Sequence, residues 1–309
     1  MVHQLRVYFG HIEMILFPFE QYGTLAAELR RAVSNLRTGR FQALRFENGE
    51  LHLDLQTQVT GEDCLVLGSI APPDEHFLSA LLLAHTLKKE GASRVTALFP
   101  YLAYARDDKV KPGQSVATAW AGSLVGASGF DRVITIDVHS SQTRQLFPVP
   151  IVSLSAAQLF ADALRQHLLT GATIVAPDEG AIGRCDAVKI AAGTPGGKTP
   201  YFEKHRTKTG IVHTGPIGQV GRIVVMIDDI LDTGGTLLSA CEKLAKAGVE
   251  EIHIMATHGL FTGQRWKGLW QLGVKRIFCT DSVPITDQMD ANNIVQLSIV
   301  SLIASELSH

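Results

Sequence analysis

The fold of this protein is decided by residues 223–236, which read IVVMIDDILDTGGT. The first five residues are apolar and mostly β-branched, a pattern that predicts a buried strand, and we expect a helix to begin near Thr236. In an open α/β sheet, ligands bind beyond the carboxyl ends of the strands. The residues that join this strand to the helix are therefore expected to form a binding site.

The residue types in this connection suit a sugar phosphate. The two glycines of residues 233–236 let the backbone curl with its N–H groups pointing inward, and the two threonines add hydroxyl donors. The start of the helix adds positive potential, so the segment can cradle a monoester phosphate. The preceding acids, Asp228 and Asp229, can accept hydrogen bonds from two adjacent sugar hydroxyls.

A repeated order of helix, glycine and strand extends along the chain. Four short apolar runs follow Gly91, Gly129, Gly248 and Gly273. A glycine suits the left-handed position that ends a helix, and the run after it is typical of a buried strand. Alternation of such strands with helical stretches indicates βαβ units and a parallel sheet.

The two halves of the chain resemble one another. Residues 64–101 and residues 223–258 both read strand, loop, helix, glycine, strand, and they are offset by nearly half of the 309 residues. We therefore expect an α/β protein with two similar domains, each a mainly parallel sheet flanked by helices. The prolines at 148 and 150 mark the expected boundary.

Composition excludes several classes of protein. With 46% hydrophobic and 19% charged residues the chain is not disordered, and a net charge of −2 does not suit a nucleic-acid-binding protein. No uncharged apolar run approaches the roughly 18 residues of a membrane span, and no secretory leader is expected. Four cysteines without paired spacing indicate neither disulfides nor a zinc site and fit the cytoplasm.

Six motifs carry a family resemblance. Residues 228–236 resemble the phosphoribosyl-pyrophosphate motif shared by phosphoribosyltransferases and ribose-phosphate pyrophosphokinases. Five further segments resemble those of the pyrophosphokinases: RFENGE at 45–50, PYLAYARDDK at 100–109, DVHS at 137–140, APDEG at 176–180 and EKHR at 203–206. Because they occur in the family's order, the chain is identified as resembling a ribose-phosphate pyrophosphokinase.

The resemblance implies two phosphoribosyltransferase-like domains. Residues 1–149 would form the pyrophosphokinase domain on the ATP side, joined by a C-terminal helix at 297–309. Residues 150–296 would carry the ribose 5-phosphate loop. The implied activity transfers the pyrophosphoryl group of ATP to the 1-hydroxyl of ribose 5-phosphate, which gives phosphoribosyl pyrophosphate and AMP for nucleotide biosynthesis.

The resemblance also assigns roles to residues. Lys204 and Arg206 would be catalytic, on a mobile lid in the basic stretch 204–215, and His139 and Asp178 would hold Mg²⁺. The implied nucleotide-binding residues are Phe46, Asn48, Glu50, Arg106 and Asp107. The implied ribose 5-phosphate-binding residues are Asp228, Asp229, Asp232, Thr233, Gly234, Gly235 and Thr236.

The partners follow from the same resemblance. ATP and ribose 5-phosphate are the expected substrates, with neither nucleic acid nor membrane as a partner. In the family, the segment of Phe46 and Glu50 reaches the neighbouring subunit's active site, which implies a homo-oligomer that is at least a dimer. Asn48 and Asp107 replace the family's aspartate and glutamine, so we expect weaker ATP affinity or looser base selectivity.

Three alternatives are weighed against this interpretation. A phosphoribosyltransferase would explain residues 228–236 but not the set of Arg106, His139, Asp178 and Lys204. A catalytically silent, synthetase-associated regulator is opposed by the retained Lys204, Arg206 and His139. Residues 192–199, AGTPGGKT, nearly match a P-loop, but a helix is expected before them and no helical pattern follows.

Overall fold

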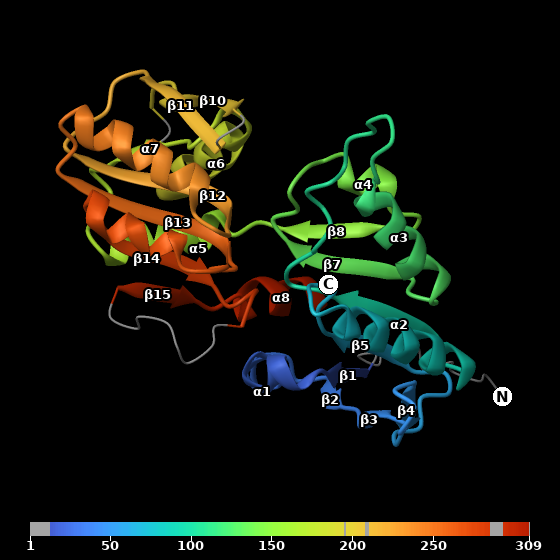
Figure 1. Ribbon diagram of the computed structural model, residues 1–309. Helices are drawn as coiled ribbons and strands as arrows, with labels where there is room; N and C mark the ends of the chain where they lie inside the picture. Colours follow the sequence, from blue (N-terminus) through green and yellow to red (C-terminus); the bar gives the residue numbers. More distant parts are fainter. Residues whose placement is uncertain (1–12, 195, 208–209, 285–292, 309) are drawn as a thin grey trace. The chain divides into compact units, whose positions relative to one another are not determined.

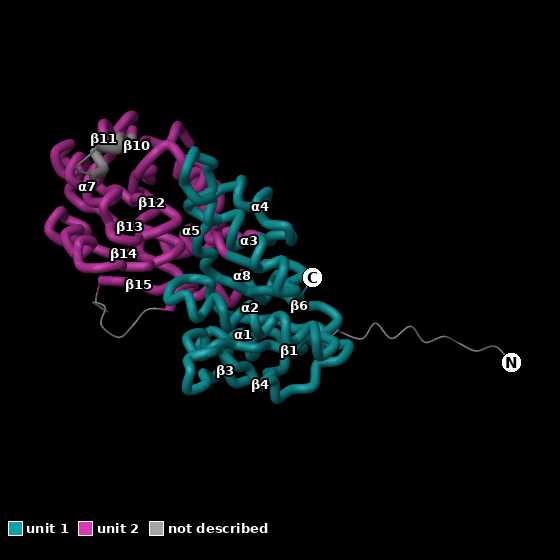
Figure 2. The backbone as a smooth tube through the Cα atoms, turned by 45° about the vertical axis from the view of Figure 1, so that its right-hand side comes forward, with its two compact units in different colours: residues 1–135, 140–152, 303–309 teal, residues 136–139, 153–302 magenta. Residues whose placement is uncertain are grey.

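The computed structural model describes residues 13–194, 196–207, 210–284 and 293–308 (Figure 1). The chain divides into two compact units (Figure 2). Unit 1 comprises residues 1–135, 140–152 and 303–309, and unit 2 comprises residues 136–139 and 153–302. The predicted α/β class, with two mainly parallel sheets flanked by helices, is confirmed. The boundary at residues 149 and 150 and the domain roles stay predictions.

Unit 1 is built on a six-stranded sheet in the order β2-β1-β5-β6-β7-β8, and the pairings from β2 to β7 are parallel. Its strands are β1 (Met14–Pro18), β2 (Leu36–Thr38), β5 (Asp63–Leu67), β6 (Arg94–Leu98), β7 (Arg132–Ile136) and β8 (Ile151–Leu154). Its helical segments are η1 (Glu20–Tyr22), α1 (Gly23–Ala32), α2 (Asp74–Lys89), α3 (Ala117–Ala127) and α4 (Thr143–Leu146). A separate antiparallel hairpin pairs β3 (Phe41–Arg45) with β4 (Leu51–Leu55).

Unit 2 is built on a five-stranded sheet in the order β15-β14-β13-β12-β9, in which every pairing is parallel. Its strands are β9 (Thr173–Val175), β12 (Ile223–Leu231), β13 (Glu251–Gly259), β14 (Val274–Thr280) and β15 (Ile294–Leu297). The helical segments are α5 (Ala157–Gln166), η2 (Glu179–Ala181), α6 (Ile182–Ala192), α7 (Gly235–Lys246), η3 (Arg265–Leu272) and α8 (Val300–Leu307), the last of which crosses from unit 2 into unit 1.

Apolar strands and one helix face form the core of unit 2. Leu237, Ala240 and Leu244 recur on the buried side of α7 at helical spacing, and they pack in one cluster with Val224 and Ile254 of the sheet. This packing holds the start of α7 at the carboxyl end of β12, where the predicted binding segment lies.

The structure corrects one predicted strand end and gives the secondary structure of the basic stretch. The expected strand 223–227 continues to Leu231, since Ile230 still pairs with His258 of β13 and Leu231 is fully buried. The basic stretch in which the lid was predicted belongs to a hairpin of β10 (Tyr201–Thr207) and β11 (Gly210–Ile217). β11 contains the β-branched residues Ile211, Val212, Thr214 and Ile217, which favour strands.

Candidate active site

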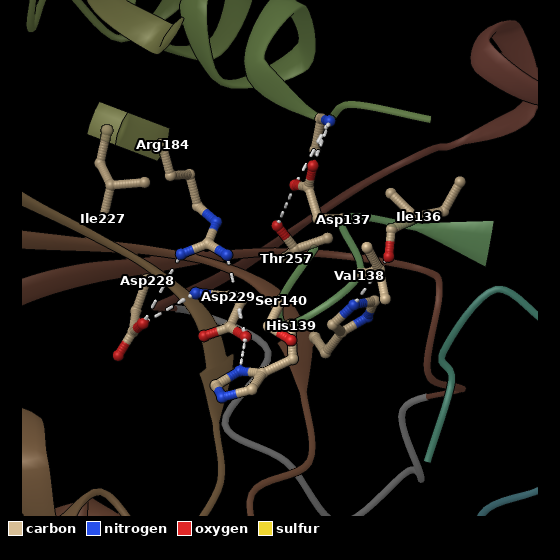
Figure 3. A network of polar contacts seen from close by, with 12 residues as sticks. Ile136, Asp137, Val138, His139, Ser140, Arg184, Ile227, Asp228, Asp229 and Thr257 are labelled. Atoms are coloured by element: carbon tan, nitrogen blue, oxygen red, sulfur yellow. Dashed lines mark hydrogen bonds and ion pairs between the residues drawn. The ribbon is translucent and has the colours of Figure 1, made fainter. Parts of the chain in front are cut away.

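Two acids of different exposure, Asp228 and Asp229, lie near the carboxyl end of β12. The N–H of Asp229 donates to Asp228 Oδ1 at 2.9 Å, which holds the two acids together. The side chain of Asp229 is 8% exposed and that of Asp228 is 16% exposed. His139, just beyond β7, approaches Asp229 so closely that its Nδ1 lies 2.5 Å from Asp229 Oδ2 (Figure 3). The structure thus joins two of the predicted sites.

Arg184 of α6 lies over the same pair of acids. Its guanidinium is 4.0 Å from Asp228 Oδ1 and 3.8 Å from Asp229 Oδ2, and its side chain is 17% exposed (Figure 3). Arg184 was not among the predicted site residues. A cation is usually found near the carboxyl end of a helix. An arginine in the first turn of the helix that follows residues 176–180 is therefore unusual, and this position was the signal that could have indicated a functional role.

Burial and neighbouring charges shift the pKa values of Asp228 and Asp229 in opposite directions. Burial and the charge of Asp229 raise the pKa of Asp228 well above its usual value. Burial also opposes ionisation of Asp229, but the bond to His139 and the charge of Arg184 outweigh it and lower the pKa of Asp229. One carboxylate therefore stays ionised beside a carboxyl group that holds its proton more tightly.

A network of hydrogen bonds holds the segment that carries His139. Asp137 has φ of 36°, in the left-handed region that non-glycine residues rarely adopt. The Thr257 hydroxyl donates to Asp137 Oδ2 at 2.7 Å (Figure 3). The N–H of Val138 donates to Ser153 Oγ at 3.0 Å. Asp137 and Thr257 were not predicted as site residues; they position His139.

The start of α7 has the form expected of an anion cradle. Gly234 adopts φ of +80°, and a Cβ there would lie 2.8 Å from Cα of Trp266. Only glycine fits this close approach. Gly235 begins the helix and Thr236 follows it, so the first N–H groups of α7 have no partner inside the helix. Asp232 and Thr233 precede this turn, and the side chain of Asp232 is partly buried.

The remaining predicted residues of unit 2 lie in three places. Asp178 follows β9 and is partly exposed, and its charge contributes to raising the pKa of Asp228, which places it near the acid pair. Lys204 and Arg206 lie on β10, opposite His213 and Ile211 of β11. The side chains of Lys204 and Arg206 lie outside the described residues, so their catalytic role stays a prediction.

The predicted nucleotide-binding residues belong to unit 1 and lie in two turns. Phe46 is 55% exposed at the end of the β3–β4 hairpin, and Asn48 Oδ1 accepts the N–H of Glu50 at 3.0 Å. Arg106 is exposed. Asp107 Oδ2 accepts the Ser115 hydroxyl at 3.0 Å and the Ala117 N–H at 3.1 Å. Asp107 therefore caps the start of α3, and its effect on the nucleotide stays a prediction.

Comparison with known proteins matches this arrangement at both ends of the chain. Residues 14–129 match the N-terminal domain of ribose phosphate pyrophosphokinase, and residues 198–308 match the phosphoribosyl synthetase-associated domain. The ribose-phosphate pyrophosphokinase of Rhodopirellula baltica is 31% identical over 307 residues, which cover 96% of this chain and 94% of the relative. The chain belongs to the ribose-phosphate pyrophosphokinase family.

Other relatives agree with this membership. The ribose-phosphate pyrophosphokinase of Bacillus caldolyticus is 28% identical over 96% of this chain and 94% of its own. The crystal structure of phosphoribosylpyrophosphate synthetase from Mycobacterium smegmatis superposes with a TM-score of 0.84 at 25% identity, over 96% of this chain and 98% of that one. In the described part of this pyrophosphokinase-family chain, no helix is long and apolar enough to cross a membrane.

A buried histidine, His258, supports the segment that carries His139. Its lowered pKa leads us to expect that the stability of this pyrophosphokinase-family protein depends on pH. His258 Nε2 donates to the Ile136 carbonyl at 3.1 Å, and Nδ1 lies 2.8 Å from Ser282 Oγ. Burial lowers the pKa of His258 to about 4. Between about pH 6.5 and 4 the imidazole of His258 binds a proton in the unfolded chain but not in the native chain. The free energy of unfolding therefore decreases by up to roughly 3 kcal/mol as the pH is lowered through this range.

This prediction is checked by urea unfolding at several pH values between 7.5 and 4.5. Asp137 and Asp228 have raised pKa values, so they stabilise the native chain as the pH falls and oppose the effect of His258. The quantity to compare is therefore the pH dependence of the unfolding free energy in the wild type and in His258→Asn. The wild type should lose more stability than the variant as the pH falls. Identical pH dependence in both proteins would contradict a neutral buried His258.

Proposed function

We propose that this chain binds ribose 5-phosphate at the carboxyl end of β12 and transfers the pyrophosphoryl group of ATP to its 1-hydroxyl. The observation that carries the proposal is the meeting of the buried acid pair, the glycine-rich start of α7 and His139 at one sheet edge. The sugar oxygen forms a bond to the β-phosphorus as the bond from that phosphorus to the α,β-bridging oxygen breaks. AMP leaves, and the hydroxyl proton is released.

The acid pair is suited to hold the ribose. Ionised Asp229 can accept a hydrogen bond from a ring hydroxyl, while its geometry is held by His139 and Arg184. Asp228, with its raised pKa, can donate as well as accept while it keeps its proton. Transfer of a phosphoryl group requires mostly positioning and charge neutralisation, which this preorganised pair supports.

The donor set fits Mg²⁺ shared with substrate phosphates. Mg²⁺ prefers oxygen and is commonly held by one or two carboxylates together with phosphate oxygens. Within the described ranges, no group of three or more His, Cys, Asp or Glu side chains could hold a metal by itself. We propose that Asp178 and His139 hold the ion, whose charge would neutralise the pyrophosphate. The bond from His139 Nδ1 to Asp229 fixes the ring and leaves Nε2 for this contact.

The deciding experiment incubates the purified protein with ATP, ribose 5-phosphate and Mg²⁺, and identifies the products. AMP and phosphoribosyl pyrophosphate are expected in equal amounts. A phosphoribosyltransferase would form no AMP from these substrates, and a silent regulator would form no product. A parallel panel with ADP and other nucleoside triphosphates tests the looser donor selectivity expected from Asn48 and Asp107.

Replacement of Lys204 tests the role of the β10–β11 hairpin. Lys204→Ala should lower kcat by about a hundredfold or more and leave both KM values nearly unchanged, because the family resemblance assigns its contact to the transition state. Steady-state kinetics with each substrate varied in turn give the answer. A raised KM with intact kcat would show that Lys204 binds the ground state instead.

The family resemblance also supports a cytoplasmic homo-oligomer of at least two subunits. Phe46 is half exposed at the tip of its hairpin, where a neighbouring subunit's nucleotide could be reached. Light scattering coupled to gel filtration measures the mass of the particle. A mass of one chain, 33.5 kDa, in a fully active sample would refute the oligomer.

A further inference from the structure

Arg265 lies beside the phosphate-binding start of α7. It is the first residue of η3, and a Cβ placed on Gly235 would meet Arg265 Nη1 at 3.7 Å and Cζ at 3.9 Å. The same Cβ would lie 3.9 Å from the hydroxyl oxygen of Thr233. Because Gly235 has no side chain, the guanidinium, the threonine hydroxyl and the first N–H groups of the helix border one space.

The backbone that carries Arg265 is held firmly against the loop. Trp266 is 2% exposed, and its backbone and Cβ lie where a side chain on Gly234 would stand. The indole Nε1–H donates to the Gly263 carbonyl at 3.1 Å, and the ring packs edge-on against Phe261 with centroids 4.9 Å apart. This anchoring fixes the point from which the arginine side chain extends.

The guanidinium of Arg265 is left available for a ligand. Within the described ranges the structure gives it no hydrogen bond and no ion pair, and its side chain is exposed. Arginine presents a planar fork of donors that matches phosphate geometry in a bidentate manner. A dianionic phosphate placed at the start of α7 would supply the acceptors that this guanidinium lacks.

We propose that Arg265 binds the 5-phosphate of ribose 5-phosphate together with the start of α7. This assignment rests on the proposed function and adds to it a cation that residues 228–236 do not contain. Arg265 is a binding residue for the ground state and the transition state alike. Its loss should therefore raise KM for ribose 5-phosphate more than it lowers kcat.

The test compares Arg265→Ala with Lys267→Ala as a matched control. Lys267 is two residues away on the same segment, and its ammonium lies over the Trp266 ring at 5.8 Å from the centroid instead of at the loop. A hydrogen bond to a charged group is typically worth enough to raise KM for ribose 5-phosphate about tenfold or more in Arg265→Ala. Lys267→Ala should keep wild-type constants, and KM for ATP should stay unchanged in both variants.

Two further measurements make the outcome decisive. Arg265→Lys keeps the charge without the fork and should recover part of the affinity. Titration calorimetry of ribose 5-phosphate alone should show the same loss in Arg265→Ala whether or not the protein turns over. Unchanged ribose 5-phosphate affinity in Arg265→Ala would overturn the inference, whereas absence of AMP from the wild type would overturn the proposed function.

Discussion

Asp229→Ala is expected to lower kcat/KM for ribose 5-phosphate by at least about a hundredfold. The change removes an acceptor for the sugar and also leaves two partners, His139 and Arg184, without their shared carboxylate. Breaking a buried charged arrangement from one side typically costs several kcal/mol, about 3 to 5, because the remaining charge is uncompensated. Steady-state kinetics and direct titration of ribose 5-phosphate measure the effect.

Two variants separate this result from general damage. Asp229→Asn keeps the shape but cannot hold the charge, so it should lose most of the same activity with a smaller loss of stability. Glu250→Ala removes the exposed partner of Arg222 beside the opposite end of β12 and should leave the kinetics unchanged. Wild-type kinetics in Asp229→Ala would refute the placement of ribose at this strand end.

Gly234→Ala is expected to destabilise the protein by roughly 2 to 5 kcal/mol and to abolish ribose 5-phosphate binding. A left-handed conformation costs a non-glycine residue about 1 to 2 kcal/mol, and forcing a methyl group into packed surroundings adds about 1 to 3 kcal/mol. The methyl group would stand 2.8 Å from Cα of Trp266, which is backbone and cannot rotate away. Thermal and urea unfolding measure the loss.

Gly235→Ala is the matched control for stability. Its φ is not positive, and the nearest atom to the added Cβ is 3.7 Å away, in the flexible side chain of Arg265. Its melting temperature should remain close to the wild-type value. Equal melting temperatures in Gly234→Ala and the wild type would show that the loop can take another course.

Much of the fold and site was predictable from local pattern. Apolar runs after glycines marked β6, β7, β13 and β14, because a buried parallel strand must be apolar on both faces. The glycines and threonines of residues 233–236 marked the turn before α7, and anion binding there stays a prediction. The family motifs predicted His139 and Asp229 as site residues, and the structure brings these two side chains together, while their roles stay predictions.

Tertiary structure decided the contacts between residues that are distant in the chain. Local pattern placed the end of β12 at residue 227, but pairing with β13 extends the strand to Leu231 and puts the two acids on it. Arg184, Thr257 and Arg265 reach the site from three different elements, and none lies in a recognisable motif. Their roles depend on distances across the fold, which one-dimensional spacing does not contain. Residues 223–236 alone therefore predict a strand, a glycine turn and the start of a helix, whereas the charges and hydrogen bonds around that turn depend on how the sheet brings those elements together.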